Sequence, residues 1–249
     1  MNASQKPYHS YIFFDVDADI RSLSNTRLEN IKKDFETLIR KRAKELNFNI
    51  HSYATLGFKS GTRFMLHINA AQPDEIQIFI RDLIHTELGA YLKITYTLFG
   101  MTRESPYKPK HNVGQEKVAT SASATAASAA PSDEQPKPAA VDEPHRYLIV
   151  YPFTKTIEWH LLPMEERRAV MKAHVGVGRT WSATVSQLLL YAYGIDDHEF
   201  IVSYYTDKLD DFQGLVMDMR ATESRRHTKN DLPIFTCVHM SIAEALSMI

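Results

Sequence analysis

The stretch Ser52–Leu83 reads SYATLGFKSGTRFMLHINAAQPDEIQIFIRDL, and it can be laid without gaps over Leu189–Arg220, which reads LLYAYGIDDHEFIVSYYTDKLDDFQGLVMDMR. Corresponding positions in this alignment are Gly57 and Gly194, Phe64 and Ile201, Asp74 and Asp211, and Phe79 and Val216. Each stretch shows an alternating strand, a short polar turn, a second strand, and an apolar-periodic helix with an acidic start. The repeat predicts two copies of one folding unit.

Elements on either side of the repeat extend both copies in the same order. Tyr11–Asp17 and Tyr147–Phe153 each predict a first strand, and residues 92–99 and 234–240 each predict a last one. In the first copy a helical stripe follows the first strand, formed by Leu28, Ile31, Phe35, Leu38 and Ile39. Strand-helix-strand-strand-helix-strand is the ferredoxin-like order. The predicted fold class is therefore α+β, with tandem duplicated ferredoxin-like domains, antiparallel sheets and the dimeric α/β-barrel type of packing.

A change of composition separates the two copies. Residues 116–144 contain no aromatic side chain, no Leu and no Ile, and consist mostly of Ala, Ser, Pro and acidic residues. Such a segment buries too little apolar surface to offset its ordering entropy, and its four prolines disfavour an alanine-rich helix. We therefore predict an N-terminal ferredoxin-like domain at 1–110, a flexible linker at 111–144, and a C-terminal ferredoxin-like domain at 145–249.

Charge and hydropathy exclude several classes of protein. The 249 residues include 29 basic and 30 acidic side chains, so the chain lacks the basic excess that nucleic acid requires. No stretch approaches the ~20 apolar residues that span a bilayer. The N-terminus has no apolar signal core, and Cys237 has no partner for a disulfide. We expect a soluble cytoplasmic protein with neither nucleic acid nor membrane as a partner.

One histidine is a candidate metal ligand. His174 lies near the end of a predicted helix that begins at Glu165, on an apolar stripe with Val170, Ala173 and Val177. A neutral imidazole on an apolar surface suits the axial position of haem iron. Gly176 and Gly178 follow, and they would let a flat macrocycle approach the backbone. The alternative is a buried histidine that is hydrogen-bonded to a backbone carbonyl.

Other polar residues are less specific. Gln187 begins an apolar strand, where it is either a donor in a pocket or an edge residue. His198, beside Asp196 and Asp197, falls in the predicted hairpin turn, so we interpret it as part of a solvated turn rather than a metal site. The chain has no phosphate-binding glycine loop, no cysteine cluster and no His-Glu-x-x-His pair.

Six motifs occur together in the second half: Tyr151-Pro-x-x-Lys155, Glu158-Trp159, Leu162-Pro-x-Glu-Glu-Arg167, His174-x-x-x-Gly-Arg179, Gly194-Ile-Asp-Asp197 and Pro233-Ile-Phe-Thr236. In this combination and order the chain resembles the chlorite dismutase-like superfamily, and within it the coproheme decarboxylases. The first half matches the superfamily only in its element order, so the resemblance implies that the domain at 1–110 is haem-free and that the domain at 145–249 binds haem or coproheme. The resemblance implies a haem enzyme of the oxidoreductase class.

The resemblance assigns roles on the two faces of a porphyrin. His174 is implied to be the axial ligand of iron, with Glu223 as the carboxylate that accepts its N–H. Gln187 stands where chlorite-decomposing members carry an arginine above the distal face. A neutral amide cannot retain an anionic oxidant electrostatically, so Gln187 favours decarboxylation over chlorite chemistry.

The resemblance also implies the substrate and the reaction. Fe-coproporphyrin III (coproheme) would be both cofactor and substrate, hydrogen peroxide the oxidant, and haem b the product. Tyr151 matches the tyrosine that carries the radical, while Lys155 and Arg220 match propionate anchors. Arg225 stands where Gram-positive members have a serine, and we expect it to bind a propionate too. Phe153 stands where many members have methionine.

Three alternatives stay open from the sequence. The first is a chlorite dismutase or haem peroxidase, and the second is a non-enzymatic haem-binding protein on the same fold. The third is a duplicated module that binds another small molecule or a protein partner, because a fold does not fix a function. Superfamily members form rings, so the resemblance also implies a homo-oligomer, most simply a pentamer.

Overall fold

The computed structural model describes residues 6–107 and 145–249, and the predicted linker lies outside them. The first half contains four strands and two α-helices in the predicted order: β1 (Tyr8–Val16), α1 (Asn25–Glu45), β2 (Asn49–Ala54), β3 (Phe64–Ala70), α2 (Pro73–Ile84) and β4 (Leu92–Met101). Short 3₁₀ turns at Ala18–Ser22 and Gly89–Tyr91 precede α1 and β4, respectively.

The second half repeats the pattern with additions. Its elements are β5 (Tyr147–Lys155), α3 (Ile157–Leu161), α4 (Met164–Thr180), β6 (Val185–Tyr191), β7 (Phe200–Thr206), α5 (Leu209–Arg220), a 3₁₀ turn (Glu223–His227), β8 (Thr228–Asn230), β9 (Phe235–Met240) and α6 (Ile242–Leu246). None of the helices in the described parts of the chain is long and apolar enough to cross a membrane.

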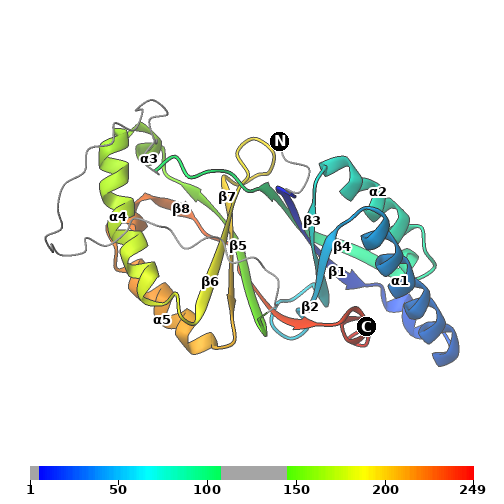
Figure 1. Cartoon of the computed structure of the whole chain (residues 1–249). Coiled ribbons are helices and arrows are strands. Elements are labelled where there is room, and N and C mark those ends of the chain that lie inside the picture. Colours follow the sequence, from blue (N-terminus) through cyan, green and yellow to red (C-terminus); the bar gives the residue numbers. More distant parts are fainter. Residues whose placement is uncertain (1–5, 108–144) are drawn as a thin grey trace, which may run out of the picture.

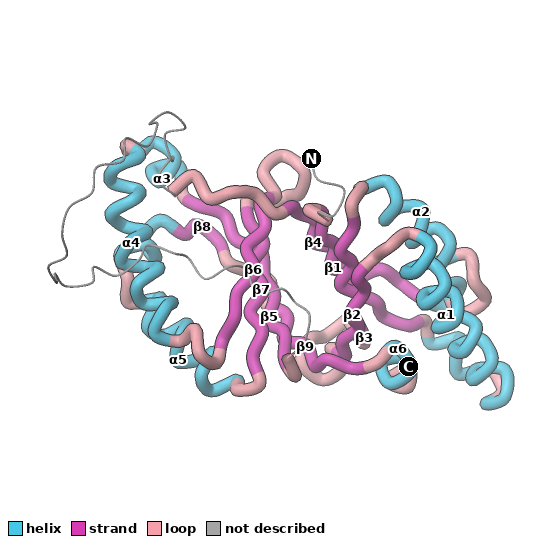
Figure 2. Tube along the Cα trace, in the orientation of Figure 1, coloured by secondary structure: helices cyan, strands magenta, loops and turns pink. Residues whose placement is uncertain are grey.

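The described strands close into a barrel. Their order is β7-β6-β4-β1-β3-β2-β9-β5-β8, and an additional β7–β5 pairing joins the ends of the ring, leaving β8 attached outside it. Each half keeps the ferredoxin-like strand order, and the halves join at the antiparallel pairs β4–β6 and β2–β9. The helices α1, α2 and α6 lie on one outer side of the strands, and α3, α4 and α5 lie on the opposite side (Figures 1 and 2). The predicted α+β duplicated fold is confirmed.

The internal repeat is present in the structure, but with a slip of one residue. Gly57 and Gly194 both adopt positive φ, 84° and 71°, which is the reason why glycine recurs at this point of both hairpins. Beyond the glycines the second hairpin is one residue shorter, because β3 begins at Phe64 and β7 at Phe200. The predicted match of Phe64 to Ile201 is therefore wrong. A slip of one residue exchanges the faces of a strand, and Ile201 packs inside the barrel.

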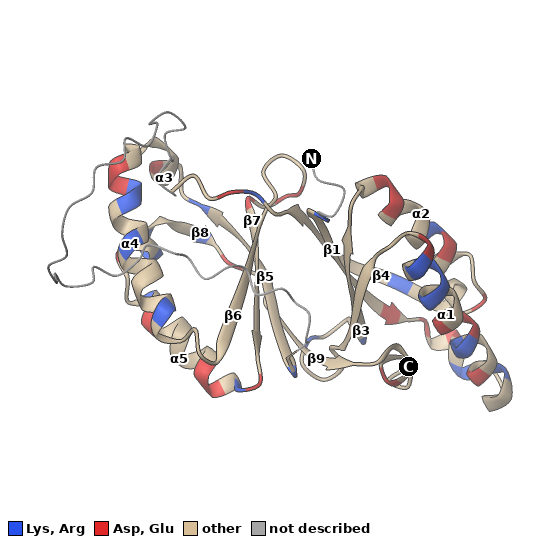
Figure 3. Ribbon diagram, in the orientation of Figure 1, with Lys and Arg blue, Asp and Glu red and all other residues tan. Residues whose placement is uncertain are grey.

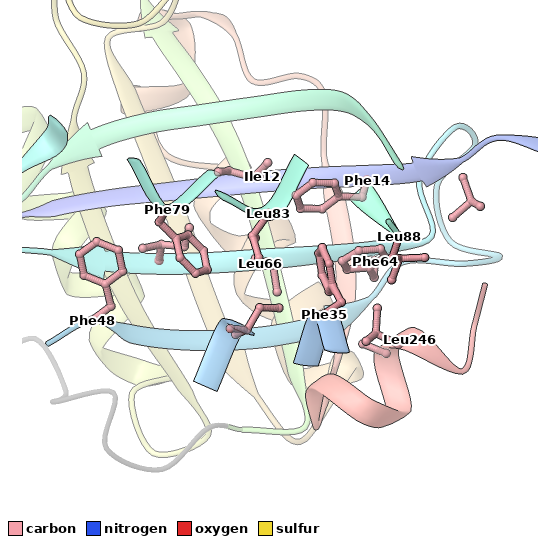
Figure 4. Packing of buried hydrophobic residues seen from close by; sticks show 14 of the residues in the cluster. Ile12, Phe14, Phe35, Phe48, Phe64, Leu66, Phe79, Leu83, Leu88 and Leu246 are labelled. Atoms are coloured by element: carbon pink, nitrogen blue, oxygen red, sulfur yellow. The ribbon is translucent and has the colours of Figure 1, made fainter. Parts of the chain in front are cut away.

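A continuous apolar core fills the space between helices and sheet in the first half (Figure 4). The helix α1 contributes Ile31, Phe35 and Ile39, and α2 contributes Ile76, Phe79 and Leu83. The C-terminal helix α6 adds Ala245 and Leu246 to the same cluster. The last residues of the chain thus pack on the first half.

A second core fills the barrel and links the halves. The rings of Phe13 and Phe235 stack with centroids 3.9 Å apart, and the Tyr11 hydroxyl lies 2.7 Å from the Ser203 hydroxyl. Both contacts join a first-half strand to a second-half strand. The barrel interior is therefore packed rather than open, and it is not the place for a ligand.

Candidate functional site

The space between helices and sheet is hollow in the second half. No residue of α4 is fully buried, and α5 buries only Leu215. A cavity of about 1920 Å³ lies there, lined by β5, β6, β7, α4 and α5. This exceeds the ~300–1000 Å³ of common small-molecule pockets and leaves room for a macrocycle.

Equivalent positions of the first strand in each half carry different side chains, and this explains why the first half has a packed core and the second a cavity. Both β1 and β5 have nine residues, and Ile12, Phe14 and Val16 of β1 belong to the first apolar core. Their positional counterparts on β5 are the predicted site residues Tyr151 and Lys155, with Phe153 between them, and all three line the cavity. Two polar side chains thus occupy positions that are apolar in the other copy.

Basic side chains dominate the charged lining of the cavity. Two acidic residues, Glu104 and Asp231, stand against nine basic ones: Lys6, Arg103, Lys155, Arg167, Arg168, Lys172, Arg179, Arg220 and Arg225. Basic positions recur along α4 (Figure 3). Apolar walls with a basic excess favour a flat, apolar ligand that carries several negative charges.

His174 lies on α4 and lines this cavity. Its Nδ1 is 3.0 Å from the Ser224 hydroxyl and 3.5 Å from the Thr222 hydroxyl, so Nε2 is the nitrogen that can ligate a metal. Burial, together with the nearby positive charge of Lys155, lowers the pKa of His174 to about 4. The imidazole is therefore neutral at pH 7, as a metal ligand must be.

The predicted contact between Glu223 and His174 is not formed. The Glu223 carboxylate faces solvent and lies 3.4 Å from the Arg226 guanidinium. Its neighbour Ser224 is buried and turns toward the imidazole. A carboxylate in this half-buried place would have to give up its hydration, whereas a serine hydroxyl meets the ring nitrogen at a smaller cost.

The two glycines after His174 lie within α4, which continues to Thr180, rather than after its end. A Cβ at Gly176 would meet nothing within 4 Å, and one at Gly178 would lie 3.0 Å from the Met219 methyl. The backbone beside His174 is thus open at Gly176 and close to α5 at Gly178. A flat ligand could therefore approach the α4 backbone at Gly176 but not at Gly178.

Tyr151 lies on β5, with its ring stacked against the buried Tyr204 at a centroid distance of 6.0 Å. Burial raises the pKa of Tyr151, a hydrogen bond with Tyr204 lowers it in part, and the Asp231 carboxylate raises it further. Arg220 and Arg225 act in the opposite direction. The phenol is consequently protonated at neutral pH, and two guanidinium groups lie near it.

Both of these arginines are paired with one carboxylate that sequence analysis missed. Asp231 Oδ2 lies 2.6 Å from Arg225 Nη1 and 3.6 Å from Arg220 Nη2. Asp231 follows β8, and no sequence motif marks it. Of the predicted anchors, the structure therefore brings Arg220 and Arg225 together, beside Tyr151.

Lys155 lies farther along β5 and is largely buried. Its ammonium is 4.8 Å from the centroid of the Trp159 ring and 5.8 Å from that of Phe153, so it is held over aromatic faces. Burial lowers the pKa of Lys155 to about 8, although Glu199 partly opposes this. The amine keeps most of its charge at pH 7 and is poorly hydrated, which suits it to bind an anion.

Gln187 is an exposed residue of β6 that lines the cavity, which supports its interpretation as a pocket residue. His198 lies in the hairpin turn, where its Nε2 is 3.2 Å from the Tyr96 hydroxyl. Asp196 accepts hydrogen bonds from the backbone N–H groups of Phe99 and His198. Within residues 6–107 and 145–249, no three His, Cys, Asp or Glu side chains gather to hold a metal ion by themselves.

Comparison with known proteins places this geometry in context. A family model described as chlorite dismutase matches residues 28–240. A coproheme decarboxylase from Mycolicibacterium smegmatis is 35% identical over 106 residues, which are 43% of this chain and 46% of that protein. The match thus spans less than half of that relative's length.

Solved structures extend the likeness to the whole fold. A mutant chlorite dismutase from Candidatus Nitrospira defluvii has a TM-score of 0.80 at 22% identity, covering 98% of this chain and 96% of the other. The chlorite dismutase of the same organism in complex with imidazole has a TM-score of 0.79 at 22% identity, covering 98% and 95%. At this identity the likeness establishes the architecture alone.

Proposed function

The chain belongs to the chlorite dismutase family, and we propose that it is a coproheme decarboxylase, which uses hydrogen peroxide to convert propionates of Fe-coproporphyrin III to vinyl groups and gives haem b. The observation that carries this proposal is the hollow second half, with nine basic and two acidic side chains in the lining and Tyr151 beside two arginines. Coproporphyrin carries four carboxylates and haem b two. A basic excess of this size favours the tetracarboxylate.

His174 holds the iron in this proposal. Its imidazole is neutral, and the Ser224 and Thr222 hydroxyls at Nδ1 orient the ring so that Nε2 faces the ligand. When bound, the iron porphyrin supplies the site at which peroxide is reduced and from which Tyr151 is oxidised. The open backbone at Gly176 leaves space for the macrocycle.

Tyr151 performs the step at the propionate. Its phenoxyl radical would remove a hydrogen atom from the β-carbon, the bond to the carboxylate carbon would break with release of CO₂, and the vinyl double bond would form. The one electron left by this cleavage would return to the iron porphyrin, which supplies the second oxidising equivalent of the peroxide. For each propionate, one peroxide and one proton are consumed, and one CO₂ and two waters are released. The contact with Tyr204 fixes the ring of Tyr151, so the reacting oxygen keeps one position.

Cations position the propionate for this step. Arg220 and Arg225 lie beside Tyr151 and can receive the carboxylate whose β-carbon is oxidised. Lys155, which lies beyond Phe153 on the same face of β5, can receive a second one. Two separate basic positions allow the porphyrin to present its reactive propionates in turn.

Gln187 favours this reaction over chlorite decomposition, the main alternative. Chlorite is an anion, and retaining it or its fragments above the iron would need a cation at the position of Gln187. A neutral amide suits uncharged hydrogen peroxide instead. A haem peroxidase or a haem-binding protein remains the alternative if the propionates do not react.

The experiment titrates the purified protein with ferric coproheme and then adds peroxide or, separately, chlorite. We expect stoichiometric binding, loss of that binding in His174→Ala, consumption of two peroxides for each coproheme, and no oxygen release from chlorite. Rapid oxygen release from chlorite with intact propionates would overturn the proposal in favour of a chlorite dismutase.

We also propose a homo-oligomer, a pentamer by resemblance, in the cytoplasm. In support of assembly, Ile157 and Leu161 on α3 are 73% and 79% exposed in the single chain. Apolar side chains that are exposed to this degree on one short helix are typical of a subunit contact. Sedimentation of the purified protein measures the subunit count.

A further inference from the structure

Asp231 resembles a ligand carboxylate in its contacts. One of its oxygens lies 2.6 Å from Arg225 and 3.6 Å from Arg220, and its side chain is 20% exposed. Propionate carboxylates would use the same guanidinium groups, with the same geometry and charge. In the protein alone, therefore, the anion site beside Tyr151 is already filled by one of the chain's own residues.

Asp231 and an incoming ligand carboxylate would compete for the same two arginines. Asp231 and Glu104 are the acidic side chains among the described residues of the lining, and Asp231 contacts both arginines. An incoming carboxylate must share the arginines with Asp231 or displace it. A porphyrin without a carboxylate at that position leaves the internal pairs intact.

We propose that Asp231 is a specificity-determining residue that exchanges with a ligand carboxylate at Arg220 and Arg225, and so sets the affinity ratio between tetracarboxylate and dicarboxylate porphyrins. The inference rests on the proposed function and deepens it. Asp231 weakens binding of the substrate carboxylate and pairs with the arginines again when that carboxylate has become a vinyl group. The two guanidinium groups thus keep a counterion after each decarboxylation.

The test measures binding in the absence of peroxide, so that no porphyrin is converted. Ferric coproporphyrin III and haem b are titrated separately into wild type, Asp231→Asn and Asp231→Glu, and dissociation constants are taken from absorbance. Asp34→Asn, which removes an exposed charge on α1, is the matched control for net charge. Asp231→Ser replaces the asparagine variant if the latter does not fold.

Asp231→Asn should bind coproporphyrin about twofold to fivefold more tightly, since a partly exposed ion pair is worth up to about fivefold in affinity. Haem b should change by less than about twofold, because it is expected to leave the pairs undisturbed. Asp231→Glu and Asp34→Asn should both stay near wild type. Equal tightening of both porphyrins, or weaker binding of coproporphyrin, would overturn the inference.

Failure of the proposed function has a different signature. A wild-type protein that binds coproporphyrin but leaves it intact with peroxide is not a decarboxylase, and the affinity ratio of Asp231→Asn still decides the role of Asp231. A wild-type protein that decarboxylates coproporphyrin, with an unchanged ratio in Asp231→Asn, overturns the role of Asp231 alone. Absence of porphyrin binding in wild type overturns both.

Discussion

The Ser224 hydroxyl lies 3.0 Å from Nδ1 of His174, whereas the neighbouring Glu223 carboxylate points to solvent. A hydroxyl fixes the ring without placing a negative charge behind it. A carboxylate would make the imidazole more basic and strengthen its donation to a metal. The structure therefore predicts a well-oriented but only moderately basic ligand.

Variants of Ser224 and Glu223 can show which of the two residues supports His174. Ser224→Ala removes the nearer of the two hydroxyls that orient the imidazole, so the coproheme dissociation constant should rise about tenfold, the lower end of the effects known for such partners. Glu223→Gln should leave it unchanged. A titration of both variants, with the ferrous iron–histidine stretch as a second measurement, decides the matter. The reverse order of effects would restore the sequence-based assignment of Glu223.

Lys155 makes coproheme binding dependent on pH. Because its pKa is about 8 in the protein, the ammonium loses its proton as the pH rises from 7 to 9. The affinity for coproheme should fall over this interval by up to about tenfold, the worth of a charge-assisted hydrogen bond. Lys155→Arg keeps its charge, so it should lack this decline, while other titrating groups affect both proteins equally. Parallel curves for the two proteins would contradict the assignment.

The barrel interior makes folding sensitive to acid. Nδ1 of His9 lies 3.0 Å from Nε2 of His67, and burial lowers the pKa of His9 to about 4 and that of His67 well below its usual value. The folded protein then binds fewer protons than the unfolded one below about pH 6.5. The free energy of unfolding should therefore fall from pH 6.5 to pH 4, by up to about 2.7 kcal/mol per pH unit for two histidines.

Urea denaturation at several pH values measures this slope. His67→Gln removes one of the two groups, so its slope should be smaller by up to about 1.4 kcal/mol per pH unit. An unaltered slope in His67→Gln would show that the acid sensitivity has another source.

Gln187 should contribute less than the ligand or the tyrosine. It lines the cavity as a neutral amide, so Gln187→Ala should lower the peroxide-dependent rate by less than about tenfold, within the range of one neutral hydrogen bond. Gln187→Arg adds a cation and should increase the affinity for anionic oxidants. Steady-state rates with peroxide, and oxygen release with chlorite, measure the two effects. A complete loss of activity in Gln187→Ala would give this residue a direct catalytic role.

Much of the fold could be predicted because the repeat is encoded in local patterns. The paired glycines, Gly57 and Gly194, mark equivalent left-handed positions in two hairpins. The length of the second hairpin could not be predicted in this way. Phe64 can be aligned with either Phe200 or Ile201, and because both are apolar, the hydrophobic pattern does not distinguish the two alignments. The gap-free alignment therefore pairs Phe64 with Ile201, whereas the true counterpart is Phe200. Ile201 faces the barrel interior, on the other side of the strand from Phe200.

The candidate site residues differ in how far the sequence alone could identify them. Lys155 corresponds to the apolar Val16 of the other copy, but this match follows only from the observed strand bounds, because the predicted first strands begin at Tyr11 and Tyr147. The roles of Ser224 and Asp231 emerge only from contacts across the chain. Adjacent residues in a 3₁₀ turn point in different directions, and sequence motifs do not distinguish which one faces inward.

The most direct test of the account is mass spectrometry of the porphyrin after peroxide is added to coproheme-loaded protein, with Tyr151→Phe beside wild type. The conservative variant keeps the ring and its stacking on Tyr204, and Tyr147→Phe on the same strand, outside the cavity, is the control. We predict two successive losses of CO₂ and hydrogen in wild type and Tyr147→Phe, and an intact tetracarboxylate in Tyr151→Phe. Full conversion in Tyr151→Phe, or none in wild type, would contradict the central claim.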